Sequence, residues 1–259
     1  MTAQFKVDQL AVEVHPDRAS LGAAAAAKAS AAIRALIARN GKAAVIFASA
    51  ASQNEFLAAL RADRAIDWQR VTAFHMDEYI GVPATHPASF RLYLREHLIK
   101  YVPVAAFHEL RGDAKDPQAE CDRYQALLRQ EQPGLVAMGI GENGHLAFID
   151  PGQCSFHEQR DVRIVELDDV CRMQQVHDGA FARIEDVPQR AISLTVPFFL
   201  RTPCAVVSVP GVTKRNAVTA ALEGPITEHC PASALRRHPN ATLYLDQESA
   251  AGLNNAARA

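Results

Sequence analysis

The stretch LVAMGIGENGHLAFIDPG, residues 135–152, contains the strongest indication of the fold. Its first six residues are apolar or glycine and predict a buried β-strand. The loop that follows presents four polar side chains, which are Glu142, Asn143, His145 and Asp150. Gly139, Gly141 and Gly144 would let this loop lie close to a ligand. A buried strand that runs directly into such a loop is typical of an open α/β sheet, which binds ligands beyond the carboxyl ends of its strands.

The rest of the chain repeats this alternation of strands and helices. Apolar runs that predict strands occupy residues 10–14, 43–48, 71–74, 135–140, 205–209 and 242–245. Helical patterns occupy residues 19–40, 53–61, 90–100, 117–129 and 213–222, and a last short helix is expected after residue 245. The alternation predicts an α/β fold with a doubly wound, mostly parallel sheet and helices on both faces. Because no linker or internal repeat interrupts it, residues 1–259 are expected to form a single domain.

The composition is that of an ordinary soluble globular protein. Of the 259 residues 49% are hydrophobic and 22% charged, and the net charge of −2 gives no overall attraction for nucleic acid or an anionic membrane. The five cysteines are far apart and odd in number, which indicates a reducing compartment and does not fit zinc-ligand spacing. Lys28 and Arg34 interrupt the alanine-rich residues 21–36, which therefore predict a helix and neither a signal peptide nor a membrane span. We expect a cytoplasmic protein without nucleic-acid or membrane partners.

Two strand ends carry features of a phosphate site. The loop Ser49-Ala50-Ala51-Ser52 places small residues and hydroxyls before a helix, whose free amides could bind an anion. Lys214 falls in the first turn of another helix, where the macrodipole disfavours a cation unless an anionic ligand binds there. The alternatives are a serine that only caps a turn and a lysine that only meets solvent.

Two other strand ends carry groups that could transfer protons. Asp77 and Glu78 are adjacent carboxylates, and partial burial could tune one of them as a base. The alternative is that one caps the next helix while the other faces water. His145 lies five residues before Asp150, whose carboxylate could orient the imidazole. The four strand ends together predict a ligand site with hydroxyls, acids, an imidazole and a lysine.

Four segments of the chain have the order and spacing of one enzyme family. They are VTAFHMDEYIGVPATHPASF (residues 71–90), MGIGENGHLAFIDPG (138–152), VPGVTKRNAVTAALEGPI (209–226) and HPNATLYLD (238–246). They resemble the glucosamine-6-phosphate deaminase/isomerase family, a relative of the 6-phosphogluconolactonases. MDEY followed by HP-x-S-[FY] is specific to the deaminases, whereas the GPDGHTAS-like loop of the lactonases is missing. The resemblance covers nearly the whole chain from about residue 43.

The resemblance implies an enzyme of amino-sugar metabolism, a hydrolase/isomerase with a ribose-5-phosphate isomerase-like fold. It would convert glucosamine 6-phosphate and water to fructose 6-phosphate and ammonia, with no metal or cofactor. Asp77 would be the base that moves a proton between C2 and C1, and His145, supported by Asp150, would assist ring opening. Lys214 and the loop 49–52 would hold the phosphate of this small-molecule partner. Because family members often assemble, a homo-oligomer is also expected.

The chain departs from the family pattern at both ends of the expected site. Ala50 and Ala51 stand inside a phosphate loop that is TGxT or TGST in the family. The arginine that grips the phosphate in known deaminases has no aligned counterpart, although Arg172 and Arg183 lie in the right part of the chain.

Two further differences lie in the glycine-rich loop. Asn143 replaces the aspartate of the best-known members and cannot carry a charge, while the neighbouring Glu142 could substitute for it. Asp150 replaces a glutamate and is one methylene shorter. These differences keep three alternatives open: a 6-phosphogluconolactonase-type hydrolase, a non-catalytic sugar-phosphate sensor, and a deaminase of another amino-sugar phosphate such as the galacto epimer.

Overall fold

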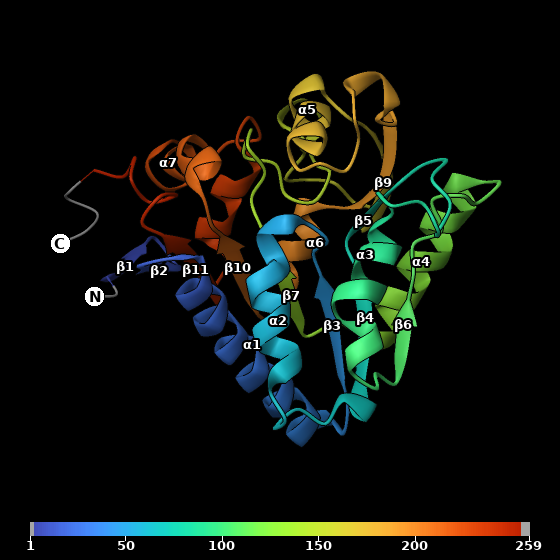
Figure 1. Cartoon of the computed structure of the whole chain (residues 1–259), viewed down its shortest axis with the longest axis horizontal. Coiled ribbons are helices and arrows are strands. Elements are labelled where there is room, and N and C mark those ends of the chain that lie inside the picture. The colour runs from blue at the N-terminus through green and yellow to red at the C-terminus, as the bar shows by residue number, and fades with distance from the viewer. Residues whose placement is uncertain (1–2, 255–259) are drawn as a thin grey trace.

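An eight-stranded sheet forms the centre of the computed structural model, which describes residues 3–254 (Figure 1). Its strands are β1 (Ala3–Val7), β2 (Leu10–His15), β3 (Ala43–Phe47), β4 (Val71–His75), β6 (Ala106–His108), β7 (Leu135–Met138), β10 (Ala205–Val209) and β11 (Ala241–Asp246). They lie in the order β1-β2-β11-β10-β7-β3-β4-β6. Only β1 runs antiparallel to its neighbour, and every other pair is parallel. The prediction of a mostly parallel sheet is confirmed.

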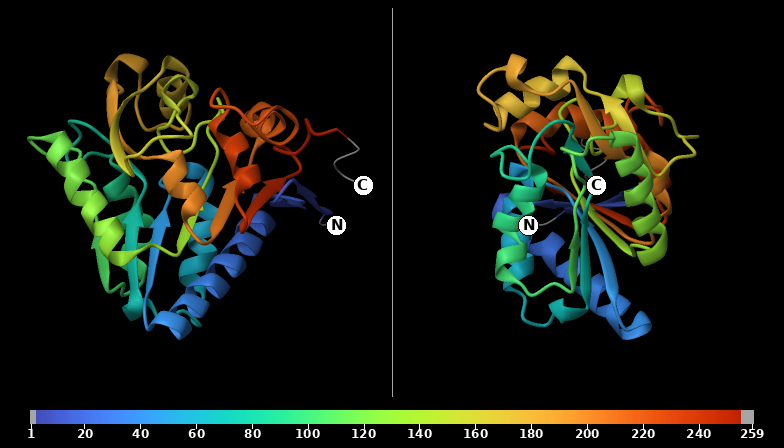
Figure 2. Two further views of the ribbon diagram at one scale, coloured as in Figure 1. Left: turned by 180° about the vertical axis from the view of Figure 1, so that it is seen from behind. Right: turned by 90° about the vertical axis from the view of Figure 1, so that its right-hand side faces the viewer.

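Helices cover both faces of this sheet, because alternate residues of each strand point to opposite sides. Val45 and Phe47 of β3 pack in a core with α1 (Arg18–Asn40), α2 (Asn54–Ala62) and α3 (Phe90–His97). Ala44 and Ile46 face a second core, which includes residues of α4 (Pro117–Glu131), α6 (Val196–Arg201) and α7 (Arg215–Glu223). The edge-on view in Figure 2 shows α3 and α4 on opposite sides of the sheet. The prediction of a doubly wound arrangement is therefore confirmed.

A small three-stranded sheet lies beyond the carboxyl ends of the main strands, together with α5 (Asp169–His177), in the upper part of Figure 1. It consists of β5 (Asp77–Tyr79), β9 (Arg190–Leu194) and β8 (Val162–Glu166), which pair antiparallel in that order. Its residues Ile192 and Leu194 belong to the same core as Ile46 of the main sheet. The sequence patterns did not predict this sheet, because its strands are short and lie between polar loops.

Two helix predictions are wrong. The helix expected over residues 90–100 ends at His97 and gives way to a 3₁₀ turn at Ile99–Tyr101. The last short helix does not form within residues 246–254, which contain turns. Asp246 fixes the first of these turns, since its carboxylate accepts the amide N–H of Ser249 at 2.8 Å. Local side-chain bonding of this kind competes with helix formation.

Helix α1 is long and apolar enough, by length and composition alone, to cross a membrane. In this fold it is a core helix, with Ala25, Ala29 and Ile33 fully buried against the sheet and α2. Gly22 lets α2 approach closely, because a Cβ there would lie 2.7 Å from the Cβ of Glu55. The prediction of a helix, made from its alanine content and its charges, is confirmed.

Candidate active site

Four neighbouring strands, β10, β7, β3 and β4, end at one cavity of about 270 Å³. The sequence-predicted residues that line it are Ser49, Ala50, Ala51, Ser52, Asp77, His145 and Lys214. The other candidates lie outside its lining, and they are Glu78, Glu142, Asn143, Gly144, Asp150 and Arg172. The cavity lies beyond the carboxyl ends of parallel strands, as the rule for open α/β sheets predicts. The fold brings together there residues that are up to 165 positions apart in the sequence (214 − 49).

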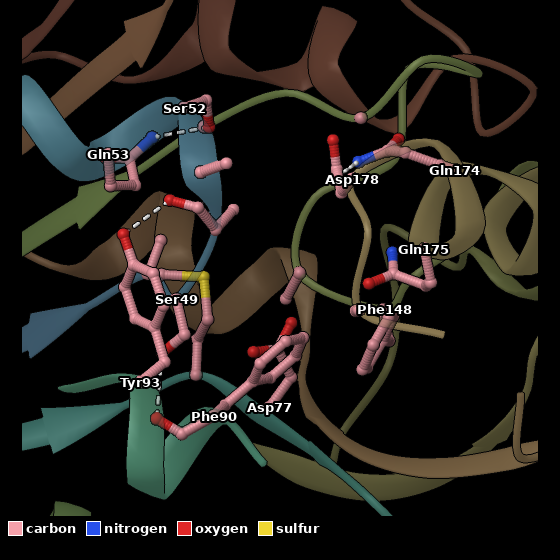
Figure 3. A pocket seen from close by; sticks show the side chains of 18 of the residues that line it. Ser49, Ser52, Gln53, Asp77, Phe90, Tyr93, Phe148, Gln174, Gln175 and Asp178 are labelled. Carbon is pink, nitrogen blue, oxygen red and sulfur yellow. Dashed lines mark hydrogen bonds between the residues drawn. The ribbon is translucent and has the colours of Figure 1, made fainter. Parts of the chain in front are cut away.

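The loop that follows β3 is fixed at the cavity by the side chains of Tyr93 and Gln53 (Figure 3). The hydroxyl of Tyr93 donates to the carbonyl of Ala50 at 2.7 Å. The amide Nε2 of Gln53 donates to Oγ of Ser52 at 3.1 Å and to the carbonyl of Ser208 at 3.2 Å. These bonds fix the loop with its serine hydroxyls and the start of α2 at the cavity, which suits an anion.

Lys214 supplies the positive charge at this end of the cavity. The residue is only 7% exposed, and its ammonium has no hydrogen-bond or ion-pair partner among residues 3–254. Burial lowers the pKa of Lys214, while the nearby carboxylates of Asp178 and Glu142 oppose that change. A buried, unpaired ammonium beside a cavity is unfavourable without a ligand and becomes favourable when an anion binds.

Asp77 lies at the end of the cavity formed by β4, with 6% of its surface exposed. Burial raises the pKa of Asp77 well above its usual range, and the adjacent carboxylate of Glu78 raises it further. The side chain of His75 fixes the backbone of Asp77, because Nδ1 of His75 lies 2.9 Å from the carbonyl oxygen of Asp77. Nε2 of His75 accepts the amide N–H of Leu110 at 2.8 Å, so Nδ1 must carry the proton and donate. Asp77 therefore has a fixed backbone and a desolvated carboxyl group, which suits a general base.

Glu78 has the structural role that the sequence left as an alternative. Its carboxylate accepts the hydroxyl of Ser89 at 2.7 Å and the amides of Phe90 and Arg91 at 3.2 Å each, which caps α3. It also pairs with Nε of the buried Arg91 at 3.1 Å. Glu78 holds α3 in place and does not reach the cavity.

His145 enters the cavity from the glycine-rich loop after β7. Its Nδ1 lies 3.1 Å from Oδ1 of Asp150, but the N–H direction does not point at that oxygen, so the contact is close without being a well-aligned hydrogen bond. Burial alone would raise the pKa of Asp150, but contacts with His145, Asn143 and the amide of Asp168 outweigh burial and lower it. Gly141 makes room for the imidazole, because a Cβ there would lie 2.1 Å from Nε2 of His145.

A buried Cys171 thiol lies beside this pair, so that ligand-type atoms of His145, Asp150 and Cys171 are within 4.8 Å of one another. This is the kind of atom set that can hold a cation. Burial and the charges of Asp150 and Asp168 raise the pKa of the Cys171 thiol well above its usual range. The raised pKa favours a protonated thiol next to a carboxylate, whereas the thiolate is the metal-binding form.

Two candidates have other partners. The amide of Glu142 donates to Oε1 of Gln174 at 2.9 Å, and its carboxylate lies 3.6 Å from Nδ1 of His177. The guanidinium of Arg172 is 3.0 Å from Asp169 and donates to the carbonyl of Ile184 at 2.6 Å. As a phosphate-gripping group, Arg172 therefore has no support from this structure. Gly144 has a φ of 86° and turns the loop, and its carbonyl accepts the amide of Ala232 at 2.9 Å.

Sequence patterns missed several polar residues of the cavity, namely Gln53, Tyr93, Gln174, Gln175 and Asp178. Figure 3 shows Ser52 and Gln53 on one side and Gln174 and Asp178 on the other. Gln174 and Gln175 belong to α5, and Asp178 is the residue after it. No pattern at a strand end indicates these three residues. A helix laid across a sheet edge is a tertiary feature that local sequence does not reveal.

The fold and this cavity define a doubly wound α/β protein with an acid–base site at its carboxyl-end edge. A family model described as glucosamine-6-phosphate isomerases/6-phosphogluconolactonase matches residues 16–244, so the chain belongs to that family. The glucosamine-6-phosphate deaminase of Exiguobacterium sibiricum is 33% identical over 198 residues, which are 76% of each chain. That of Streptococcus pneumoniae serotype 4 is 34% identical over 184 residues, 71% of this chain and 77% of its own.

Solved structures agree with this assignment. A monomeric glucosamine-6-phosphate deaminase superimposes with a TM-score of 0.86 and 26% identity, covering 93% of this chain and 99% of its own. The 6-phosphogluconolactonase of Trypanosoma brucei has a TM-score of 0.78 at 19% identity, covering 94% and 98%. At that identity the second likeness concerns the fold alone.

Proposed function

We propose that the chain catalyses the isomerisation of an amino-sugar 6-phosphate coupled to loss of ammonia, converting glucosamine 6-phosphate and water to fructose 6-phosphate and ammonia. The observation that carries this proposal is Asp77, a buried carboxyl group without a side-chain partner among the described residues, in the same cavity as His145 and Lys214. Relatives of about one-third identity over about three-quarters of the chain are glucosamine-6-phosphate deaminases, which supports the choice of reaction.

Asp77 acts as the base in this reaction. Its raised pKa makes the ionised carboxylate a stronger base than an exposed aspartate. It takes the proton from C2 of the open-chain sugar and returns it to C1, while the carbonyl oxygen at C1 gains a proton and the amino nitrogen loses one, which leaves a hydroxyl at C1 and an imine at C2. Water adds to that imine and ammonia departs, so that atoms and charge balance. His145 handles the proton of the ring oxygen when the pyranose opens, and Asp150, 3.1 Å from its Nδ1, stabilises the charged imidazole.

The phosphate group lies at the other end of the cavity. Lys214 and the serine hydroxyls and amides of residues 49–52 bind it, which satisfies the unpaired ammonium. Asn143 positions the catalytic loop: its carbonyl oxygen accepts the amide of His145 at 3.0 Å, and its Nδ2 donates to Asp150 at 3.0 Å.

The experiment that tests this function measures ammonia and fructose 6-phosphate released from glucosamine 6-phosphate, beside its galacto epimer. We expect turnover with one of these sugars and loss of turnover in Asp77→Asn. Faster hydrolysis of 6-phosphogluconolactone would favour the lactonase. A rise in melting temperature on adding glucosamine 6-phosphate, without any product, would favour the sensor.

The setting of the enzyme is part of the same proposal. The five cysteines are free, which supports a reducing, cytoplasmic location. The shared core of the two sheets supports a single domain over residues 1–259. The expectation of a homo-oligomer stays a prediction, to be measured by sedimentation, and the structural relative described as monomeric is the contrary precedent.

A further inference from the structure

The lining of the cavity contains an acidic side chain, Asp178, as well as the cation of Lys214. Lys214 is the one lysine or arginine in the lining formed by residues 3–254. Asp178 lines the same cavity and is the foremost of the acidic groups that act on Lys214. A carboxylate in the same lining reduces the net attraction of Lys214 for a doubly charged anion. Lys214 can donate hydrogen bonds to a ligand, and the carboxylate of Asp178 can accept one from it.

Asp178 is held in this position by the glycine-rich loop. Its amide donates to the carbonyl of Gln174 at 2.8 Å at the end of α5, and Nε2 of Gln174 approaches its Oδ2 at 3.4 Å. The same Gln174 accepts the amide of Glu142 at 2.9 Å, which ties α5 to the loop. The long 3.4 Å contact leaves most of the acceptor capacity of the carboxylate unused.

We propose that Lys214 and Asp178 together form a site for the monoanion of a phosphate ester. Lys214 donates to a charged phosphate oxygen, and the protonated P–OH of the monoanion donates to the carboxylate of Asp178. The dianion has no proton to offer, and its second charge faces that carboxylate. Asp178 is thus a specificity-determining residue for the ionisation state of the substrate. This inference rests on the proposed function only for the presence of a phosphate on the substrate.

Other titratable groups surround the pair and are common to every variant in the test. Glu142 and Cys171 lie near Lys214, His177 lies beside Glu142, and Asp77 and His145 occupy the reacting end of the cavity. Their effects on binding therefore cancel when the wild-type protein is compared with Asp178→Asn at each pH. The substituted amide keeps the shape of the side chain, removes its charge and puts an N–H donor in place of one acceptor oxygen.

The test measures the dissociation constant of glucose 6-phosphate by calorimetry at several pH values. The second ionisation of a phosphate monoester lies near pH 6, so binding of the monoanion should weaken about tenfold per pH unit between about pH 7 and pH 8. In Asp178→Asn the dissociation constant should change by less than about threefold between about pH 7 and pH 8. At about pH 8 the variant should bind glucose 6-phosphate more tightly than wild type does. Glu185→Gln, which removes an exposed acid of the same segment outside the cavity lining, should behave as wild type.

Binding that is independent of pH in the wild type, or an equally steep dependence in Asp178→Asn, would overturn the inference. Failure to bind glucose 6-phosphate at any pH would overturn it as well. Because binding needs no turnover, failure of the proposed reaction is a separate result, seen as the absence of ammonia release from amino-sugar phosphates.

Discussion

Nδ2 of Asn143 lies 3.0 Å from Oδ1 of Asp150, the same oxygen that approaches Nδ1 of His145 at 3.1 Å. A second contact joins Nδ2 of Asn143 to Oδ2 of Asp168 at 3.1 Å. One amide group thus lies between two carboxylates and donates to both. An aspartate at residue 143 would have no proton to donate at neutral pH and would add a third negative charge. The asparagine is therefore matched to the acids around it in this chain.

Asn143→Asp is expected to destabilise the protein, because it replaces two donated hydrogen bonds with repulsion between carboxylates. We expect the free energy of unfolding at neutral pH to fall by about 1–3 kcal/mol, measured by urea denaturation. Adding Asp168→Asn should recover part of the loss, since it removes one of the facing charges. An unchanged or higher stability of the single variant would contradict this account of the loop.

Asp77→Asn is expected to separate activity from stability. Turnover of glucosamine 6-phosphate should fall about 10²–10⁴-fold, the usual contribution of a general base. The melting temperature near neutral pH should rise, because the variant no longer buries an ionisable group whose pKa burial has raised. That gain should disappear as the pH falls below the ordinary pKa of 3.8, where the carboxyl is neutral in both the folded and the unfolded state. A lower melting temperature with retained turnover would argue against Asp77 as the base.

The acidic limb of the pH–rate profile should also report on Asp77. Only the ionised carboxylate can accept the C2 proton, and its pKa in the free enzyme lies well above 3.8. We therefore expect kcat/KM to fall as the pH drops through this raised value, at a higher pH than an exposed aspartate would give. A profile that stays level down to about pH 4 would contradict the assignment.

The sequence was sufficient for six of the eight strands of the main sheet and for four of their ends, because buried parallel strands are continuous apolar runs and their loops carry polar groups. It missed β1 and β6, the two edge strands. It could not decide between Asp77 and Glu78, since adjacent side chains on a strand point to opposite sides and the neighbours that bind each come from elsewhere in the chain. Asp178 escaped notice for a related reason. Its chemistry comes from the cavity that it shares with Lys214, and its place there depends on contacts of α5 such as that of Gln174 with Glu142.

Gly141→Ala tests whether the glycine-rich loop positions the imidazole. A Cβ at residue 141 would lie 2.1 Å from Nε2 of His145, so the ring must move away from its place in the cavity. We expect kcat to fall at least about tenfold, since small displacements of a catalytic group are costly to the rate. The matched control is Gly152→Ala in the same loop, where a Cβ would have no neighbour within 4 Å and kcat should be unchanged. Equal kinetics for the two variants would show that the ring has room to adapt.

His75 should make the stability of the protein depend on pH. Burial lowers the pKa of His75 from 6.5 to about 3, so the folded state keeps the ring neutral where the unfolded chain would protonate it. Its contribution to stability is complete above pH 6.5 and is lost as the pH falls from there toward about 3. Relative to His75→Gln, which removes this titration, wild type should lose about 3 kcal/mol of unfolding free energy between about pH 6.5 and pH 4. His157→Gln, at an exposed histidine, serves as the control and should keep the wild-type dependence of unfolding free energy on pH. The prediction fails if His75→Gln keeps that dependence too.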